Sequence, residues 1–256
     1  MNPLERMRLL QAFNINGFHN ELGQTGEWLL ASATFAPGQC AVAFDRSADN
    51  AFFVASSLQQ VAIALTAEKF LGSAVAPPHG FAAAFSAFGD AGLHLLIRRV
   101  HQLSVSLPSI PWEEFQSRTS SFPQTTEIER LTVQRIGQDI FRAALVEYWG
   151  GECAVSGIDQ TELLRASHVK PWAACSENPE QRLDVCNGLL LVADVDAAFD
   201  AGLISFADDG SCLLSHSLTP SAHARFSSSR ILKRERVSEG HRAFLDWHRK
   251  HVFHEQ

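Results

Sequence analysis

One stretch of the sequence, residues 165–206, carries polar residues whose types and spacing could do chemistry. It reads RASHVKPWAACSENPEQRLDVCNGLLLVADVDAAFDAGLISF. A histidine titrates near neutral pH, so His168 could accept a proton from a water molecule. Asp196 and Asp200 are four residues apart, and on a helix their carboxylates would project from one face. These like charges repel each other, and a divalent cation held by oxygen ligands would stabilise them.

Each of these residues also has a purely structural interpretation. A histidine shortly before a proline can belong to a packed loop, and Asn187 can simply open an Asn-Gly turn. Asp200 can hydrogen-bond within the turn of FDAGL while Asp196 faces solvent. As an ordered set the residues indicate a functional site more strongly than any one of them does, because no packed core requires His168, Asn187 and the aspartate pair together.

The elements that must position these residues are short. The segment ELLRASHVKPW predicts a strand leading into a loop, because Pro171 stops regular pairing just after His168. The segment NGLLLVADVDAAFDAG predicts a turn, an apolar run and then a helix that carries the aspartate pair. LISFADDGSCLLS alternates around Asp-Asp-Gly, which is typical of a hairpin. Before them, TTEIERLTVQRIGQDIFRAALVEYWGG predicts an amphipathic helix with a capping box of Thr126 and Glu129.

In this order, LLRASHVKPW, RLDVCNGLLLVADVDAAFDAGLISF and DDG resemble the HNH endonucleases. They are similar specifically to the bacterial branch with a His-Val/Ile-Lys-Pro-Trp signature. The resemblance covers residues 127–215. It implies a ββα-metal fold, in which two strands and a helix surround one divalent metal ion. It also implies metal-assisted hydrolysis of phosphodiester bonds, with DNA as the partner.

The resemblance assigns roles to five positions. His168 matches the general base that activates water, and Asn187 matches the asparagine that braces the loop and orients that base. Asp196 stands where the family usually has its last histidine, a metal ligand, and Asp200 could be a second ligand or a brace. Ser167 stands where many members have an acid or a histidine. Because carboxylates prefer hard cations, the expected cofactor is one Mg²⁺ or Mn²⁺ ion.

Basic residues near this stretch are candidates for contacts with DNA phosphates. Lys170 lies two residues beyond the candidate base. The densest basic run is RILKRER, which contains Arg230, Lys233, Arg234 and Arg236. For each of these side chains, a solvated surface position is the alternative.

The composition bounds the class of protein. The 256 residues are 46% hydrophobic and 19% charged, which is typical of a globular protein. The formal net charge of −7 excludes a non-specific coat on nucleic acid, but it does not exclude a nuclease whose carboxylates hold a metal ion. No apolar run predicts a membrane span. The five cysteines form no CxxC pair, so we expect a cytoplasmic protein without a disulfide framework.

The chain is expected to be an α+β protein of two domains. Residues 107–126 contain three prolines and a Ser/Thr cluster, which predicts a linker. Residues 1–118 would form a mixed α/β domain, and residues 119–256 the ββα-metal nuclease domain with its core at about 150–215. In the first domain, GLHLLIRRVHQLSV fits either a strand or a short helix. Its histidines, His94 and His101, are expected to be ordinary core or surface residues.

A separate N-terminal domain suggests recognition or regulation. By architectural analogy, we expect a restriction or defence endonuclease whose N-terminal domain reads DNA. A nuclease effector activated by a ligand or a partner protein stays open, and so does a catalytically inactive DNA-binding protein on the same scaffold. A homodimer would suit double-strand cleavage.

Overall fold

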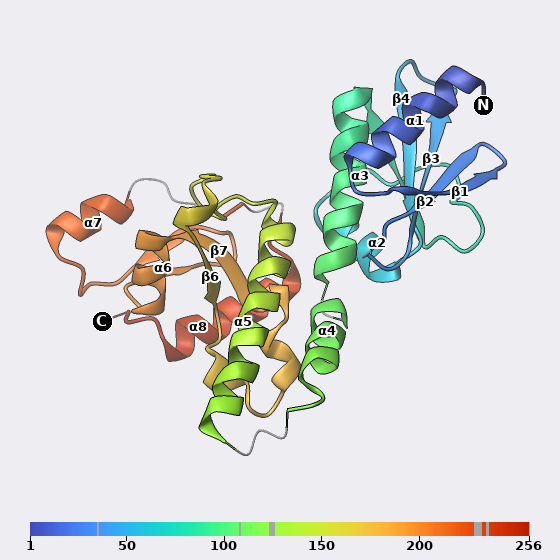
Figure 1. The fold of residues 1–256 in the computed structure, drawn as a ribbon. Coiled ribbons are helices and arrows are strands. Elements are labelled where there is room, and N and C mark those ends of the chain that lie inside the picture. Colours follow the sequence, from blue (N-terminus) through green and yellow to red (C-terminus); the bar gives the residue numbers. More distant parts are fainter. Residues whose placement is uncertain (35, 108, 123–125, 228–231, 234–235, 256) are drawn as a thin grey trace. The chain divides into compact units, whose positions relative to one another are not determined.

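The computed structural model describes residues 1–34, 36–107, 109–122, 126–227, 232–233 and 236–255 (Figure 1). The chain divides into two compact units, Met1–Val105 and Ser106–Gln256. Both units combine helices with antiparallel strands, which confirms the α+β class. Within the described ranges, no helix is long and apolar enough to cross a membrane.

The first unit is built on a five-stranded antiparallel sheet in the order β1-β2-β3-β4-β5. The strands are β1 (Asn20–Thr25), β2 (Trp28–Ser32), β3 (Gln39–Asp45), β4 (Ala51–Ser56) and β5 (Ala83–Phe88). The helices are α1 (Pro3–Ile15), α2 (Gln59–Ala67) and α3 (Gly89–Ser106). Strand β4 is buried at every position, because it pairs on both sides and carries apolar residues on both faces.

The segment GLHLLIRRVHQLSV, which fitted either a strand or a short helix, is part of helix α3. Its residues Leu93, Leu96, Ile97 and Val100 are buried, and their spacing of three or four residues is that of one helical face. The two histidines of α3 have partners within this unit. His94 Nδ1 lies 2.8 Å from Asn16 Nδ2, and the His101 ring meets the Phe18 ring edge on.

The second unit is assembled from short strands packed among helices. Its helices are α4 (Ser109–Thr119), α5 (Glu127–Trp149), α6 (Ala193–Asp200), α7 (Pro220–Ser227) and α8 (Glu239–His251). Strand β6 (Leu164–His168) pairs antiparallel with β7 (Gly188–Val192), and β8 (Ile204–Phe206) with β9 (Cys212–Leu214). The 3₁₀ turns η1 (Thr161–Leu163), η2 (Trp172–Cys175), η3 (Pro179–Arg182) and η4 (Val185–Asn187) lie in the connections.

Helix α4 occupies residues that the sequence predicted to be a linker. Pro111 lies in its first turn, where a helix tolerates proline, and it is buried. Trp112 and Phe115 stack on each other, and the Phe115 ring meets the Trp172 ring edge on at 6.5 Å. These aromatic contacts, which local composition does not reveal, explain why the segment is helical. The compact units divide after Val105, whereas the domain boundary that we expect lies after residue 118.

Helix α5 begins and ends as the sequence predicts, and it packs on the β6–β7 hairpin. Its N-terminus has the capping box of Thr126 and Glu129, and Gly150 ends it with a φ of 69°. The close approach of the helix to the hairpin depends on Gly188. A Cβ atom there would lie 2.5 Å from Phe141 Cζ.

Candidate active site

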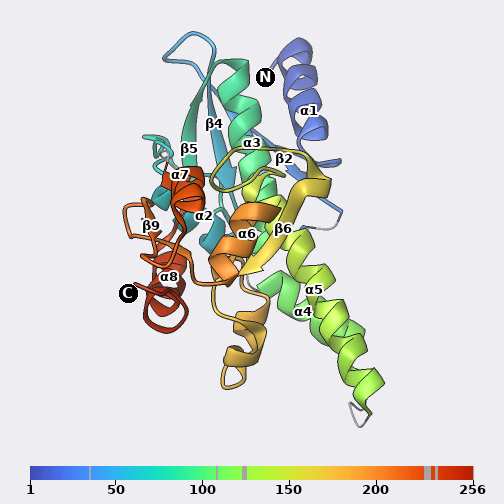
Figure 2. The ribbon, with the colours of Figure 1, turned by 90° about the vertical axis from the view of Figure 1, so that its left-hand side faces the viewer.

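The β6–β7 hairpin and α6 bring four of the predicted site residues together. His168 is the last residue of β6, where it pairs with Gly188 of β7, and α6 follows β7 directly. Helix α6 packs against β6, and the two elements lie side by side in Figure 2. Ser167, His168, Asp196 and Asp200 line one pocket of about 450 Å³. This is the ββα arrangement that the sequence predicted.

The His168 ring is held between a carbonyl oxygen and an aromatic ring. Its Nε2 lies 2.9 Å from the Arg182 carbonyl oxygen, and its plane stacks on Phe141 at 3.8 Å. A carbonyl oxygen only accepts hydrogen bonds, so Nε2 carries the proton, and Nδ1 of the neutral ring is a proton acceptor. Burial lowers the pKa of His168 below its ordinary value. The ring is therefore neutral at pH 7.

Asn187 is fully buried and ties together the loop that follows His168. Its Oδ1 accepts a hydrogen bond from Lys170 N at 2.7 Å. Its Nδ2 donates to the carbonyl oxygens of Lys170 at 3.1 Å and Gln181 at 2.8 Å. The interpretation as a simple Asn-Gly turn does not hold, because Gly188 is in extended backbone as the first residue of β7.

The two aspartates and Ser167 form an oxygen-rich wall of the pocket. Ser167 Oγ donates to Asp200 Oδ1 at 3.2 Å, and a hydrogen bond from Ser167 also lowers the pKa of Asp196. Burial nevertheless raises the pKa of both carboxyls, and the charge of Asp196 raises the pKa of Asp200 further. Asp200 bonds across to β6 and not within its own turn, so the local-turn interpretation is also wrong.

These donors fit a hard divalent cation. Among the residues that the structure describes, no three His, Cys, Asp or Glu side chains gather as a metal site. Mg²⁺ needs no such set, because it usually takes one or two carboxylates and keeps several water molecules. Asp196, Asp200 and the Ser167 hydroxyl offer only oxygen, and a cation would relieve the repulsion between the two carboxylates.

The predicted DNA-contacting residues lie in different surroundings. Lys170 Nζ is 3.0 Å from Gln181 Oε1 and lies over the Trp247 ring, 5.8 Å from its centroid. Lys233 forms an ion pair with Glu152, and the Arg236 guanidinium donates to the Trp149 carbonyl oxygen. Arg230 and Arg234 lie outside the described residues. A contact between the basic run and DNA stays a prediction, and its two described members already have partners within the unit.

Helix α8 supplies a wall of the pocket that the sequence did not predict. His248 lines the pocket and is buried, with Nδ1 3.0 Å from Ser205 Oγ and Nε2 3.2 Å from the Phe199 carbonyl oxygen. Burial lowers the pKa of His248 to about 4, so this ring is neutral as well. No spacing in the sequence connects a histidine so far along the chain with α6.

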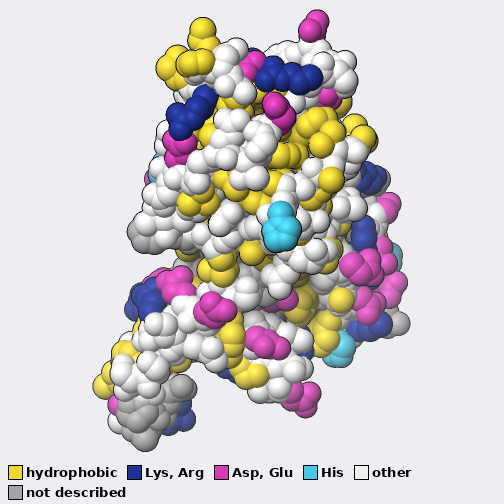
Figure 3. Space-filling model, turned by 90° about the vertical axis from the view of Figure 1, so that its right-hand side faces the viewer, with side chains coloured by type: hydrophobic (Ala, Val, Ile, Leu, Met, Phe, Trp, Pro, Cys, Tyr) yellow, Lys and Arg dark blue, Asp and Glu magenta, His cyan; other side chains and the backbone are white. Residues whose placement is uncertain are grey.

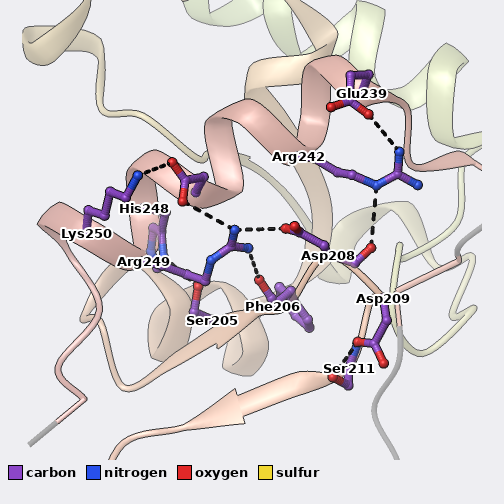
Figure 4. Close-up of polar contacts among 11 residues, drawn as sticks. Ser205, Phe206, Asp208, Asp209, Ser211, Glu239, Arg242, His248, Arg249 and Lys250 are labelled. Atoms are coloured by element: carbon purple, nitrogen blue, oxygen red, sulfur yellow. Dashed lines mark hydrogen bonds and ion pairs between the residues drawn. The ribbon is translucent and has the colours of Figure 1, made fainter.

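Polar contacts fix α8 on strand β8 (Figure 4). Arg249 donates to the Phe206 carbonyl oxygen at 2.8 Å and forms an ion pair with Asp208 at 2.8 Å. Arg242, about two turns earlier, donates to the Asp208 carbonyl oxygen at 3.5 Å. The position of His248 is thus set by contacts along the length of the helix.

Arg165 is a second pocket residue that was not predicted from the sequence. It is exposed and stands two residues before Ser167 on β6. Side chains alternate between the faces of a strand, so Arg165 and Ser167 share a face of β6. That alternation was readable in the sequence, and it is the signal that would have found this residue.

The comparison with known families bears on the same segment of the chain. Residues 153–207 match the family described as HNH endonuclease. The match contains β6, β7 and α6, together with His168, Asn187 and the aspartate pair. Helices α5 and α8, which contribute Phe141 and His248 to the surroundings of the site, lie outside it. No protein among the curated ones matches the chain.

Proposed function

We propose that this protein, whose C-terminal region contains an HNH endonuclease domain, is a metal-dependent endonuclease that hydrolyses phosphodiester bonds in DNA. The observation that supports the proposal best is one pocket lined by a neutral histidine and two repelling carboxylates. A base and a cation site side by side are what hydrolysis of a phosphodiester by water needs.

His168 acts as the general base in this mechanism. Its Nδ1 takes a proton from the attacking water molecule, while Nε2–H stays bonded to the Arg182 carbonyl oxygen. That bond favours the charged ring, so it stabilises the imidazolium that forms as the proton arrives. Asn187 holds the backbone of Lys170 and Gln181, and thereby fixes the loop that continues from the base.

Asp196, Asp200 and Ser167 would hold the Mg²⁺ or Mn²⁺ ion. Such an ion, when bound, supplies Lewis-acid stabilisation of the charge on the phosphate and on the leaving oxygen. The residues that keep these donors in place are His248, through the Phe199 carbonyl oxygen of α6, and Ser167, through Asp200.

We also propose a role in restriction or defence, in the cytoplasm, with the first unit as a DNA-reading or regulatory module. The first unit has its own sheet and core, which a separate module requires. On the face drawn in Figure 3, Lys and Arg side chains are scattered among Asp and Glu and form no continuous basic strip. Reading by this face would therefore depend on shape and specific contacts more than on charge. The homodimer stays a prediction.

Plasmid cleavage tests the proposal. Purified wild-type protein, His168→Ala and the matched control His216→Ala are incubated with Mg²⁺ or Mn²⁺ and with plasmids carrying unmodified or modified cytosines. His216 is an exposed histidine of the same unit. We expect cleavage by the wild type and the control, and a loss of about 10²–10⁴-fold in His168→Ala, because general-base catalysis is removed.

Two results would contradict the proposal. One is equal cleavage by His168→Ala. The other is a wild type that cuts neither substrate with either metal ion, which would favour an effector that needs an activating ligand or an inactive DNA-binding scaffold. A preference for one cytosine state would support DNA reading by the first unit.

A further inference from the structure

Arg165 places a guanidinium at the wall of the pocket that carries the acids. It lies on the same face of β6 as Ser167, whose hydroxyl reaches Asp200, and it lines the same pocket as Asp196. Its charge also lowers the pKa of Asp196. A positive side chain therefore stands beside the donors that would hold the cation.

The hydrogen bonds of Arg165 leave one edge of its guanidinium available. Nη1 donates to the carbonyl oxygens of Glu162 and Leu164, each at 3.0 Å. Nε and Nη2 donate to no group in the described part of the chain, and no described carboxylate lies within ion-pair distance of Arg165. The Nε–Nη2 edge has the fork geometry that binds two oxygens of a phosphate.

A second arginine adds positive charge at the same place. Arg142 of α5 donates from Nη1 to the Leu164 carbonyl oxygen at 2.9 Å and from Nη2 to the Thr161 carbonyl oxygen at 3.2 Å. Two guanidinium groups therefore converge on one oxygen atom, that of Leu164. Like charges this close repel each other, and an anion bound between or beside them would relieve the repulsion.

Several other arginines of the described chain have a carboxylate partner. Arg225 forms an ion pair with Asp194 at 2.5 Å, and Arg8 forms one with Asp90. The backbone oxygens that hold Arg142 and Arg165 orient the two groups without neutralising them. An anion that enters the pocket would meet both a fixed donor edge and an unbalanced charge.

We propose that Arg165 binds the oxygens of a DNA phosphate at the pocket through its Nε–Nη2 edge, with Arg142 strengthening the positive potential beside it. The inference rests on the proposed function, since it names a phosphate contact of the same site. The contact holds the backbone of the substrate against β6, opposite the aspartates of α6. The alternative role for Arg165 is only to balance the charge of Asp196, and it predicts that the salt dependence of DNA binding does not change when Arg165 is replaced.

The test measures DNA binding and metal binding separately. Arg165→Met and Arg165→Lys are made in the His168→Ala background, so that DNA is not cut. Arg130→Met is the matched control, because Arg130 is an exposed arginine that also donates to a carbonyl oxygen, that of Thr126. Binding of a labelled duplex is followed by fluorescence anisotropy over a range of KCl concentrations, and Mn²⁺ binding is followed by calorimetry.

For Arg165→Met we expect a Kd for DNA about 10-fold higher and a plot of log K against log[KCl] shallower by about 0.9, the value for one lost phosphate contact. Arg165→Lys should keep the slope and regain only part of the affinity, because lysine lacks the fork. Arg130→Met should match the His168→Ala parent. Mn²⁺ should bind Arg165→Met at least as tightly as the parent, because a positive charge near Asp196 is gone.

An unchanged salt slope, weaker Mn²⁺ binding by Arg165→Met, or a parent that binds no DNA would each overturn the inference. Its failure differs from failure of the proposed function. If the wild type cuts DNA but Arg165→Met has the salt slope of its parent, only the proposed contact of Arg165 with a phosphate is refuted. If the slope becomes shallower in Arg165→Met but the wild type never cuts DNA, the proposed nuclease activity fails and the phosphate contact of Arg165 stands.

Discussion

Replacing Asn187 with alanine should destabilise the second unit, because this buried side chain bonds three backbone groups. The change removes the hydrogen bonds to Lys170 N at 2.7 Å, Lys170 O at 3.1 Å and Gln181 O at 2.8 Å. At about 1 kcal/mol net for each bond, the free energy of unfolding falls by about 3 kcal/mol. For a unit of this size, each kcal/mol lowers Tm by about 2–4 °C, so Tm should fall by about 6–12 °C.

The assay is a thermal melt of the full chain, followed by calorimetry so that the transitions of the two units are separated. Asn178→Ala is the control, because Asn178 is exposed in the neighbouring loop and its side chain makes no capping bond. Cleavage should also fall in Asn187→Ala, because the loop after His168 loses its anchor. A Tm within about 2 °C of the Asn178→Ala protein would refute the argument, since the loss of three hydrogen bonds of a buried side chain should cost more than this.

Three further changes test the site and the packing around it. Because burial lowers the pKa of His168, kcat/KM for cleavage should fall on the acid side with a midpoint below pH 6.5, and a midpoint above that value would contradict the assignment. The pKa of Asp200 is raised in the folded protein, so the ionised carboxylate destabilises the fold at pH values above this pKa. Asp200→Asn should therefore raise Tm at pH 7. The increase should be at most about 2–4 °C, because Asp200 is exposed and water screens its charge. The same variant should lose the increase in Tm that Mn²⁺ gives to the wild type, and a retained increase would place the cation elsewhere. Gly137→Ala in α5 should lower the free energy of unfolding by about 1–3 kcal/mol, because the added Cβ would lie 2.4 Å from Trp172 Cη2. Urea unfolding measures this change. A higher free energy of unfolding, as helix propensity alone predicts, would show that the Trp172 ring moves away.

The sequence predicts the local part of the site well, because that part depends on short-range patterns. The strand that Pro171 stops and the apolar run after Asn187 correspond to β6 and β7, and the four-residue spacing of the aspartates places both on one face of α6. Their chemistry follows from residue type. The candidate metal donors, the candidate base and the amide of Asn187 thus lie within one continuous segment, residues 167–200.

The remainder of the site depends on contacts between distant parts of the chain. Phe141 stacks on His168 from α5, and His248 bonds the Phe199 carbonyl oxygen from α8. A periodic pattern can predict each of these helices, but it cannot predict which face meets which loop. The same reason applies to α4, where the contact of Phe115 with Trp172 outweighs a linker-like composition.

Because α8 forms one wall of the pocket and lies near the C-terminal end of the chain, the pocket becomes complete only late in synthesis. His168 and both aspartates leave the ribosome well before His248, which is 48 residues beyond Asp200. Until α8 is synthesised and docks on β8, the end of α6 lacks the His248 contact to Phe199, and the pocket lacks one side. A nascent chain that already contains His168, Asp196 and Asp200 therefore does not yet have the complete pocket around them. If the proposed nuclease activity is correct, this delay would confine full activity to molecules in which α8 has docked.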